Sequence, residues 1–496
     1  EIRTWSGCSQ VLTVEGDCGA VLLVHGELGP CVLGIHALGN SHHTIVATPI
    51  TIEMVVAAKA HFDCFHIQSG APDFSGPAEK INLGPLNVKS PLRYIPNGHA
   101  TVFGSVIGHR SHNKSRVRRT IMAEAAEKYG YTQKFGAPVM KGWLPWHLAI
   151  NDMVKTSTSF RQDIVDECVR AFTKDILNRL SAEDLADVSV YDTFTAVNGA
   201  AGVAYVDKLN RSTSMGFPWH KSKKHYLHSV PPRGELQDPV DFDDEFYARV
   251  QTIVDNYEAG QANMPIFTAH LKDEPTKFKK VTSGATRVFG GAPADWSIVV
   301  RMHLLSVIRL MQMNRFIFEA APGTIAQSRE WEEIYQYLTY FGKDRIIAGD
   351  YGKYDRKMPT SFILGAFRII HSICKAAGYT ETELKIVEGI AVDTANPTYN
   401  MNGDFVQFYG SNPSGHPLTV LINGLANSLF MRYCYLILNP DMECTTFKDN
   451  VNLMTYGDDN VMGVKHTVNW FNHTAISQVL ASHGIDYTMA DKESVS

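Results

Sequence analysis

Two adjacent aspartates, Asp458 and Asp459, interrupt a stretch of the sequence that otherwise has the pattern of buried β-structure. Apolar residues stand on both sides of them, and the glycine before them is typical of a turn that joins antiparallel strands. Two neighbouring carboxylates repel each other, and either is costly to bury without a cation nearby. The sequence therefore predicts a β-hairpin with both carboxylates at its tip and a metal ion beside them, although an ordinary surface turn has the same pattern.

A second pair of carboxylates, Asp350 and Asp355, follows the apolar segment RIIAG. Asp350 ends a predicted strand, and Asp355 stands where a helix could begin. If this strand neighbours the hairpin, Asp350 and Asp458 could hold two divalent ions about 3.5–4 Å apart. Such a pair activates an attacking hydroxyl and stabilises a leaving pyrophosphate, so the spacing favours nucleotidyl transfer.

Two further segments have residue types that suit a nucleotide. Residues 412–433 read as a Ser-Gly loop that opens a long helix, and Thr419 and Asn423 project from one face of that helix. Upstream, residues 272–287 contain a cationic strip suited to a triphosphate. Its members are Lys272, Lys277, Lys279, Lys280 and Arg287.

The composition is that of an ordinary globular chain. It has 496 residues, of which 44% are apolar, and a net charge of -5, so contact with nucleic acid must come from local basic patches. One candidate is 109–119, with five Lys or Arg residues and no acid, which also fits a solvated loop. Eight cysteines without a CxxC pair indicate reduced thiols in a reducing compartment. The most apolar stretch, 419–438, contains polar side chains, so no membrane span is expected, and no signal peptide is recognised.

Pattern changes along the chain predict several domains. Residues 1–50 contain short β-like runs separated by glycines, and residues 52–62 have the pattern of a helix. Residues 67–80 are rich in Ser, Gly and Pro and indicate a linker. Helical periodicity dominates from about residue 120, and strands alternate with helices after about residue 345. We place domain boundaries at 68/69 and at 345/346.

In their order along the chain, the chemical segments resemble motifs F, A, B and C of the RNA-dependent RNA polymerases of picorna-like viruses, such as marnaviruses and dicistroviruses. Residues 213–219 resemble motif G, and residues 482–494 resemble the end of motif D. The resemblance covers roughly 210–496 and implies an α+β right-hand polymerase. Its fingers would occupy 69–345 and its palm 346–496, truncated before the thumb. Motif F departs from the pattern at Ala285, where many picornavirus relatives carry a basic residue.

The resemblance implies a role for each matching residue. Asp350 and Asp458 would be the principal ligands of two Mg²⁺ or Mn²⁺ ions, with Asp459 as a weaker ligand, and Lys492 would protonate the pyrophosphate. Thr213 and Ser214 would guide the template. The nucleotide would be bound by Lys272, Lys280, Arg287, Asp355, Ser414, Gly415, Thr419 and Asn423, of which Asp355 and Asn423 would sense the ribose 2′-hydroxyl with support from Thr419.

The same resemblance implies partners and a location. The partners are an RNA template, nascent RNA, nucleoside triphosphates, a small viral protein primer and other viral replication proteins. The expected location is the host cytoplasm, in membrane-associated replication complexes.

The N-terminal residues resemble a different enzyme. The segments TVEGDCG at 13–19 and GIHALGN at 34–40 resemble the second barrel of the chymotrypsin-like cysteine proteases that precede the polymerase in these viral polyproteins. This implies an all-β protease remnant at 1–68, with Cys18 as nucleophile and the backbone of 16–18 as oxyanion hole. Thr13 and His36 would line a pocket that reads glutamine. The general base is expected before the first residue, and cleavage is predicted between Gln68 and Ser69.

Two other functions remain open at this point. Reverse transcriptases also carry an aromatic-x-Asp-Asp hairpin, but the Asp355 and Asn423 pair, the Ser-Gly loop and the protease-like segment oppose that reading. Alternatively, the chain could act mainly as a protease–polymerase precursor or as an RNA-binding scaffold. Since a base and a thumb are expected outside these 496 residues, we expect that the chain alone neither cleaves peptides nor extends a primer efficiently.

Overall fold

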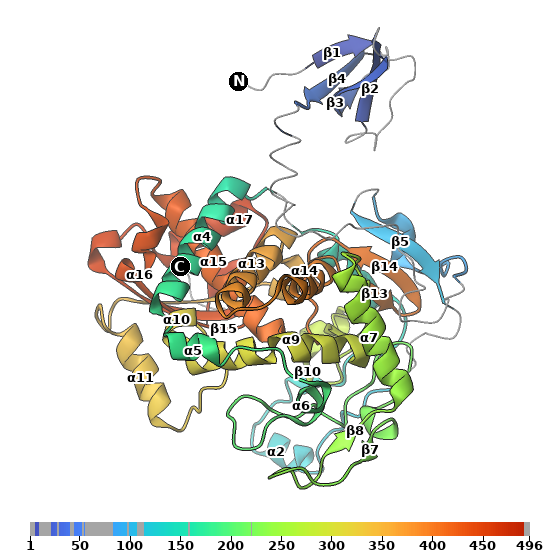
Figure 1. Ribbon diagram of the computed structural model, residues 1–496, viewed down its shortest axis with the longest axis vertical. Helices are drawn as coiled ribbons and strands as arrows, with labels where there is room; N and C mark the ends of the chain where they lie inside the picture. The colour runs from blue at the N-terminus through green and yellow to red at the C-terminus, as the bar shows by residue number, and fades with distance from the viewer. Residues whose placement is uncertain are drawn as a thin grey trace. The chain divides into compact units, whose positions relative to one another are not determined.

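A computed structural model of the chain describes residues 5–8, 21–26, 29–39, 44–51, 54, 83–96, 99–106, 114–156, 159–219 and 221–490. The chain forms two compact units (Figure 1). The first comprises Glu1–His66 with Pro96–Gly98, and the second comprises Ile67–Ile95 with His99–Ser496. The predicted boundary after residue 68 and the predicted helix at 52–62, apart from Met54, lie outside the described residues.

The first unit contains a four-stranded antiparallel sheet with the strand order β1-β4-β3-β2. Three of its strands coincide with short β-like runs in the sequence. On β4, Ile45 and Ala47 are buried while Thr44 is exposed, which is the alternation of a strand with one face in a core. The strands are β1 (Trp5–Cys8), β2 (Val21–Gly26), β3 (Gly29–Gly39) and β4 (Thr44–Pro49).

The second unit is built around a four-stranded antiparallel sheet with the order β15-β16-β12-β17. Strands β15 (Val451–Tyr456) and β16 (Asp459–Val464) form a hairpin, as the sequence pattern predicts. Strand β12 (Ile346–Tyr351) pairs with β16 on one side and with β17 (Tyr487–Met489) on the other. The predicted strand and the predicted hairpin are therefore neighbours in one sheet.

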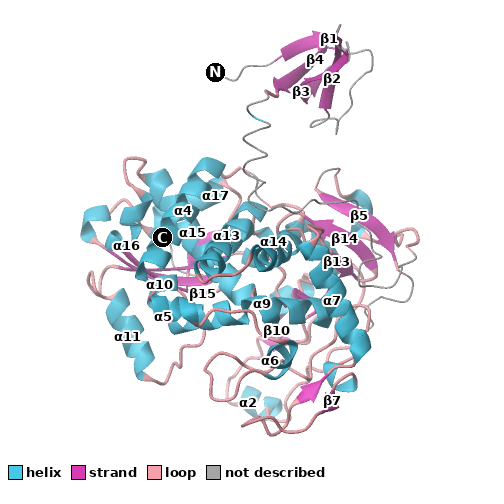
Figure 2. Cartoon of the chain, viewed as in Figure 1, coloured by secondary structure: helices cyan, strands magenta, loops and turns pink. Residues whose placement is uncertain are grey.

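Long helices pack around this sheet (Figure 2). Helix α15 (Thr419–Leu438) contacts β15 and also packs on α4 (Gln162–Arg179), α13 (Thr360–Ala376) and α17 (His473–Ser482). Phe362 of α13 stacks on Phe430 of α15 with ring centroids 3.9 Å apart. By length and apolar composition α15 could cross a membrane, but 89% of that apolar window is buried inside the protein, as in a core helix.

A second sheet lies in the same unit, with the order β11-β9-β13-β14-β5. Only β9 and β13 run parallel in it; the other neighbours are antiparallel. Helix α9 (Ala294–Met313) packs on it through Trp296, whose ring lies 5.4 Å from that of Phe267. The strands are β5 (Ala100–Ser105), β9 (Ile266–Leu271), β11 (Val288–Gly291), β13 (Thr398–Met401) and β14 (Asp404–Phe408).

Side-chain caps mark the start of two further helices, of which α7 coincides with a periodic segment of the sequence. Helix α14 (Glu381–Ala395) begins with a capping box in which Thr380 and Glu383 satisfy each other's backbone N–H groups. Helix α7 (Asp244–Glu258) is capped by Asp243. The other described elements are η1 (Pro91–Tyr94), α2 (Ala123–Lys128), β6 (Phe135–Gly136), α3 (Leu144–Met153), α5 (Ala182–Ala186), α6 (Thr193–Asn198), η2 (Lys223–His225), β7 (His228–Ser229), β8 (Val240–Asp241), β10 (Thr276–Lys277), α8 (Phe278–Thr282), α10 (Arg315–Phe318), α11 (Arg329–Leu338), α12 (Tyr354–Lys357), η3 (Cys444–Thr446), α16 (Phe447–Asn450) and η4 (His466–Val468).

Candidate active site

The tip of the β15–β16 hairpin carries the two adjacent aspartates. The last cross-strand pair is Tyr456 with Asp459, so Gly457 and Asp458 are the two turn residues. Gly457 has a φ of 64°, a conformation that glycine adopts without strain. Both aspartates are exposed. The turn therefore presents two carboxylates at the end of the sheet.

Asp350 lies beside this tip on β12. The pairing of β12 with β16 runs as far as Gly349 and Asn460, and one further step along both strands brings Asp350 level with Asp459. On its other side Asp350 pairs with Thr488, whose hydroxyl donates to the Asp350 backbone carbonyl over 3.3 Å. The strand pairing thus gathers three carboxylates at one end of the sheet.

The donor chemistry at this sheet end suits a hard divalent cation. Within the part of the chain that the structure describes, no group of three or more His, Cys, Asp or Glu side chains is preassembled as a metal site. Mg²⁺ does not require one, because it commonly binds one or two carboxylates and completes its shell with water and substrate phosphate oxygens. Asp350 and Asp458 supply such a donor set, so these side chains fit a hard divalent ion that completes its shell with other oxygen ligands.

Asp355 and Asn423 are in direct contact next to the tip. The Asn423 Nδ2 group donates to Asp355 Oδ1 over 2.5 Å, and the Tyr354 hydroxyl donates to the Asn423 backbone carbonyl over 2.9 Å. Burial raises the pKa of Asp355 to about 6; the bond from Asn423 opposes this rise, and the charge of Asp458 adds to it. Asp355 is therefore electrostatically coupled to the hairpin tip.

The loop that precedes α15 folds back on the first turn of that helix. The Thr419 hydroxyl donates to the Pro413 carbonyl over 2.8 Å. Gly415 is exposed, Ser414 is half-buried, and Gly415 forms a parallel bridge with Gly291 at the end of β11. A Cβ atom on Gly415 would lie only 2.3 Å from the carbonyl oxygen of residue 290, so this close approach requires glycine.

Two members of the cationic strip, Lys272 and Arg287, lie side by side at neighbouring strand ends. The Lys272 N–H donates to the Arg287 carbonyl over 2.8 Å. Both side chains reach Glu274, with Lys272 Nζ 3.0 Å and Arg287 Nη1 3.4 Å from its carboxylate oxygens. Arg287 is close enough to oppose the rise in the pKa of Asp355. Lys280 is exposed on α8.

The described end of the basic segment, 114–119, lies against this strip. The Ser115 hydroxyl and the Arg116 N–H both donate to the Asp273 carboxylate over 2.6 Å. These bonds hold the segment against Asp273, the residue that follows Lys272 in the sequence. They leave both predicted interpretations, a solvated loop or a phosphate contact, open.

Thr213 and Ser214 lie in a loop that a buried lysine closes. Lys223 Nζ donates to the Thr213 hydroxyl and to the Ser214 carbonyl, each over 2.7 Å. Burial lowers the pKa of Lys223 to about 8. The Ala294 N–H donates to the Met215 carbonyl over 2.8 Å, which fixes the loop to the start of α9. Thr213 and Ser214 are thus anchored to the segment that follows β11.

Asn427, one turn after Asn423 on α15, contacts the hairpin tip directly. Its Nδ2 group donates to the three backbone carbonyls of 457–459 over 3.1–3.4 Å. Its Oδ1 atom accepts from the Tyr351 hydroxyl over 3.1 Å and from Asn460 Nδ2 over 2.9 Å. In the sequence, Asn427 is only one of the polar side chains that interrupt the apolar stretch 419–438. Its spacing of four residues from Asn423 was the signal that could have identified it.

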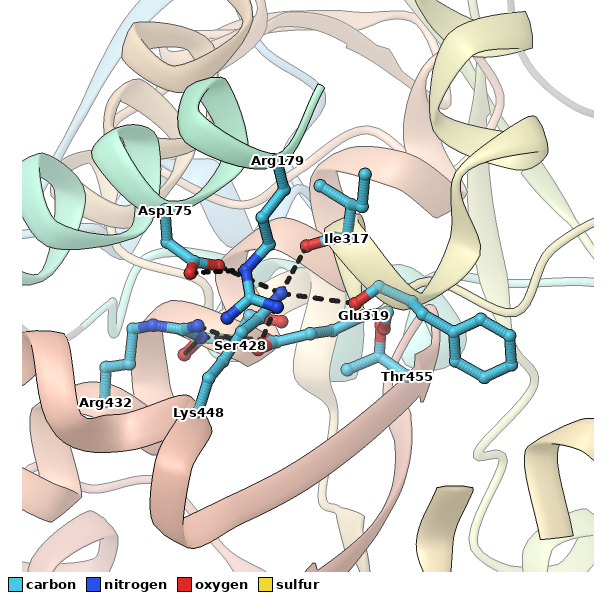
Figure 3. A network of polar contacts seen from close by, with 9 residues as sticks. Asp175, Arg179, Ile317, Glu319, Ser428, Arg432, Lys448 and Thr455 are labelled. Carbon is cyan, nitrogen blue, oxygen red and sulfur yellow. Dashed lines mark hydrogen bonds and ion pairs between the residues drawn. The ribbon is translucent and has the colours of Figure 1, made fainter. Parts of the chain in front are cut away.

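Three positions before Asp458, Thr455 is hydrogen-bonded to the backbone of a buried charged residue, Glu319 (Figure 3). Its N–H and its hydroxyl both donate to the Glu319 backbone carbonyl over 2.8 Å. The Glu319 carboxylate accepts two bonds, of 2.7 and 2.8 Å, from the Arg432 guanidinium. That guanidinium packs on the rings of Phe172 and Phe447, 3.8 and 4.4 Å from their centroids. The β15–β16 hairpin is therefore linked to α15 through a buried ion pair.

Lys448 extends this group towards α4. Its Nζ atom donates to the Ile317 carbonyl over 2.6 Å and lies 3.0 Å from the Asp175 carboxylate, which also accepts from Arg179 over 2.7 Å. We call Asp175, Arg179, Glu319, Arg432 and Lys448 the ion cluster. Glu319 and Arg432 are almost completely buried, and nothing in the sequence pattern indicated that they pair.

Several predicted residues lie outside the described part of the chain. They are Thr13, Cys18, Gln68, Ser69 and Lys492, and their roles stay predictions. His36 is described: it lies on β3, is 5% exposed, and neither ring nitrogen has a hydrogen-bond partner. Free thiols in the described part of the chain include Cys8, Cys168, Cys374, Cys434 and Cys444.

Comparison with known proteins identifies the class to which this architecture belongs. A family model described as viral RNA-dependent RNA polymerase matches residues 121–496, which is more than half of the chain. The chain therefore belongs to the viral RNA-dependent RNA polymerase family. The predicted relationship to picorna-like viruses is confirmed by its relatives.

These relatives are viral polyproteins. The chain is 26% identical to the replicase polyprotein of Drosophila C virus (strain EB), over 96% of this chain and 28% of that protein. It is 28% identical to the replicase polyprotein of Cricket paralysis virus, over 61% of the chain and 18% of that protein. It is 23% identical to the RNA1 polyprotein of Red clover mottle virus, over 96% and 25% respectively. The chain thus spans 18–28% of the length of these relatives.

Proposed function

We propose that this chain carries out template-directed RNA synthesis in the replication of a picorna-like viral genome. In each cycle the 3′-hydroxyl oxygen of the growing RNA bonds to the α-phosphorus of a nucleoside triphosphate. The bond between the α-phosphorus and the bridging oxygen breaks, and pyrophosphate leaves. The observation that carries the proposal is the meeting of Asp350 with Asp458 at one sheet end, within a domain of the polymerase family.

Asp350 and Asp458 are the proposed ligands of two Mg²⁺ or Mn²⁺ ions, with Asp459 in a weaker role. Such ions, when bound, lower the pKa of the attacking hydroxyl and stabilise the charge of the leaving pyrophosphate. The exposed position of Asp458 and Asp459 supports this assignment, because each ion must exchange with solvent and substrate between cycles.

The nucleotide is oriented by two groups of side chains. Lys272 and Arg287 bind its phosphates, exchanging their present partner Glu274 for the triphosphate. Lys280 lines the path of entry, and Lys492 gives a proton to the leaving pyrophosphate. Ser414 and Gly415 lie beside the nascent base pair.

Asp355 and Asn423 select the sugar, with Thr419 holding the loop before them. An RNA strand enters past Thr213 and Ser214. A small viral protein serves as primer, and the enzyme acts with other replication proteins in membrane-associated complexes of the host cytoplasm.

The N-terminal residues 1–68 are proposed to be part of a glutamine-specific cysteine protease, followed by fingers at 69–345 and palm at 346–496. Cys18 is its nucleophile, and Thr13 and His36 line its specificity pocket. Two observations support this: residues of this region are included in the 96% of the chain that aligns with the Drosophila C virus polyprotein, and His36 keeps both ring nitrogens free for a ligand amide. Cleavage of the precursor by the complete protease should produce a polymerase that starts at Ser69. A different N-terminus, found by sequencing, would reject this site.

A primer-extension assay separates the proposal from a scaffold or precursor role. The chain, expressed with its natural flanking sequence, is given an RNA template, an annealed primer and nucleoside triphosphates with Mg²⁺. We expect extension that follows the template sequence, and its loss in Asp350→Ala. A wild-type protein that binds RNA but does not extend the primer would instead favour the scaffold.

Sugar selection has its own test. A site that hydrogen-bonds a hydroxyl rejects the analogue without it, because its polar groups are left unpaired. Asn423→Ala and Asp355→Ala should lower the ratio of incorporation efficiencies for ATP and dATP by about one to three orders of magnitude. An unchanged ratio in both variants would remove these residues from the role.

A further inference from the structure

Asn423 is the end of a chain of side-chain hydrogen bonds that begins in the loop before α15. Asn423 Oδ1 accepts from Asn412 Nδ2 over 2.7 Å. Asn412 Oδ1 lies 3.1 Å from His416 Nε2, and His416 Nδ1 lies 3.3 Å from the Leu418 N–H. All four of these residues are buried, so their polar groups depend on one another rather than on solvent.

The donors and acceptors in this chain of hydrogen bonds follow one consistent direction. A backbone N–H can only donate, so His416 Nδ1 must be the unprotonated nitrogen, and Nε2 then carries the proton. That proton is donated to Asn412 Oδ1, which turns the Asn412 amide so that its nitrogen faces Asn423. Asn423 in turn must face Asn412 with its oxygen and Asp355 with its nitrogen. Each amide orientation is thereby set by the residue before it.

The surroundings of His416, the first side chain in this series of hydrogen bonds, keep its ring neutral. Burial lowers the pKa of His416 to about 3, so the ring does not become charged at working pH. Its ring lies 6.0 Å from that of Trp296, edge to face. Trp296 is itself fixed, because its indole N–H donates to the Tyr257 hydroxyl over 2.8 Å. The histidine is thus held in one position and one tautomer.

We propose that Asn412, held by His416, is a positioning residue for ribose selection. The inference rests on the proposed function, since it assigns a role towards the ribonucleotide. With its oxygen occupied by Asn412, Asn423 can offer only N–H donors, while Asp355 offers carboxylate oxygens. A ribose 2′-hydroxyl both donates and accepts, so this arrangement matches it on both counts. If the Asn423 amide were reversed, two acceptors would face each other at Asp355 and the match would be lost.

The test is a set of substitutions outside the ribose contact itself. Asn412→Asp has nearly the same shape, but it replaces the donor to Asn423 with an acceptor and so favours the reversed amide. Asn412→Ala removes the contact, and His416→Leu removes the donor that orients Asn412. The matched control is Asn198→Asp, because Asn198 is also buried but bonds to the backbone of Val240 far from α15 in sequence.

Incorporation efficiencies for ATP and dATP are measured on one RNA template for all variants and for the wild type. We expect the ATP/dATP ratio to fall about tenfold in the Asn412 variants, mainly through a higher KM for ATP, and less in His416→Leu. Asn198→Asp should keep the wild-type ratio even if it unfolds at a lower temperature. The ratio is internal to each protein sample, and three variants carry the prediction, so the test does not depend on the folding of one of them.

The outcomes separate this inference from the proposed function. Ratios within about twofold of wild type in both Asn412 variants, or equal losses for both nucleotides, would overturn the positioning role while leaving polymerase activity established. A wild-type protein that incorporates neither nucleotide would overturn the proposed function, and this inference with it.

Discussion

Two opposite electrostatic environments lie three positions apart on the β15–β16 hairpin, at Asp458 and at Thr455. At its tip, Asp458 is exposed and has two like-charged neighbours, Asp350 and Asp459. At Thr455 the same strand is bound to Glu319, whose carboxylate is buried and paired with Arg432. One end of this short segment gathers negative charge at the surface, and the other neutralises it in the core.

The two environments suit different roles: ion binding at the tip and structural support at Thr455. A charge that must bind exchangeable ions has to stay accessible, whereas a buried charge is tolerated only when it is paired and hydrogen-bonded. The ion cluster fixes β15, the strand that leads into the tip, and Asn427 fixes the turn itself. Changes at the tip should therefore remove activity without unfolding the protein. Changes in the ion cluster should lower both the activity and the free energy of unfolding.

The largest effect on stability is expected from Glu319→Ala. It leaves the Arg432 guanidinium buried without its carboxylate, which should lower the free energy of unfolding by about 3–5 kcal/mol. Chemical denaturation of the purified protein measures this loss. The matched variant is the double substitution Glu319→Leu with Arg432→Met, which removes both charges and should recover part of the stability. No recovery in the double variant would show that the pair is not the source of the effect.

A smaller loss of stability, together with a loss of activity, is expected from Asn427→Ala. The backbone carbonyls of the turn lose a buried donor, and the Tyr351 hydroxyl loses its acceptor. The free energy of unfolding should fall by about 1–3 kcal/mol. Nucleotide incorporation, measured at a temperature where the variant is folded, should fall about tenfold or more because the aspartates are no longer held in place. Wild-type incorporation by the folded variant would show that the turn keeps its shape without this side chain.

A third effect on stability is a pH dependence in the metal-free protein. The pKa of Asp355 is raised from 3.8 to about 6 in the folded state, so the folded protein binds more protons than the unfolded one between these values. Its contribution to the free energy of unfolding is present at low pH and is lost as the pH rises through about 6. Asp355→Asn should flatten this decline, by about 2–3 kcal/mol, when unfolding is followed between pH 4 and pH 7. An identical pH profile in the variant would contradict the raised pKa.

The sequence predicted the parts of the site whose signals are local. Gly457 with two aspartates indicates a hairpin tip, and an aspartate after an apolar run indicates a strand end, because strand and turn preferences are properties of a few neighbouring residues. Thr419 and Asn423 were predicted to share a face from helical spacing alone. The order of these segments then indicated the family, which the family model confirms for residues 121–496.

The supporting contacts could not be predicted in the same way. Glu319 and Arg432 are 113 residues apart, and a buried ion pair leaves no periodic pattern in either segment. Asn412 and His416 are close to Ser414 in sequence, but their hydrogen-bond direction depends on how the loop folds back on α15. The contact of Glu274 with Lys272 and Arg287 has a clearer sequence signal, because it is an acid that stands near two cations in the sequence.

The most direct test of the account compares Asp458→Ala with Asp441→Ala, an equally charged and exposed residue away from the hairpin tip. Single-nucleotide incorporation is measured with Mg²⁺ and with Mn²⁺, alongside the thermal midpoint of each variant. We predict that Asp458→Ala loses incorporation by about 10³-fold or more with both ions while its midpoint stays close to that of the wild type, and that Asp441→Ala behaves as wild type. Wild-type incorporation by folded Asp458→Ala would contradict the assignment of the hairpin tip as the centre of nucleotidyl transfer.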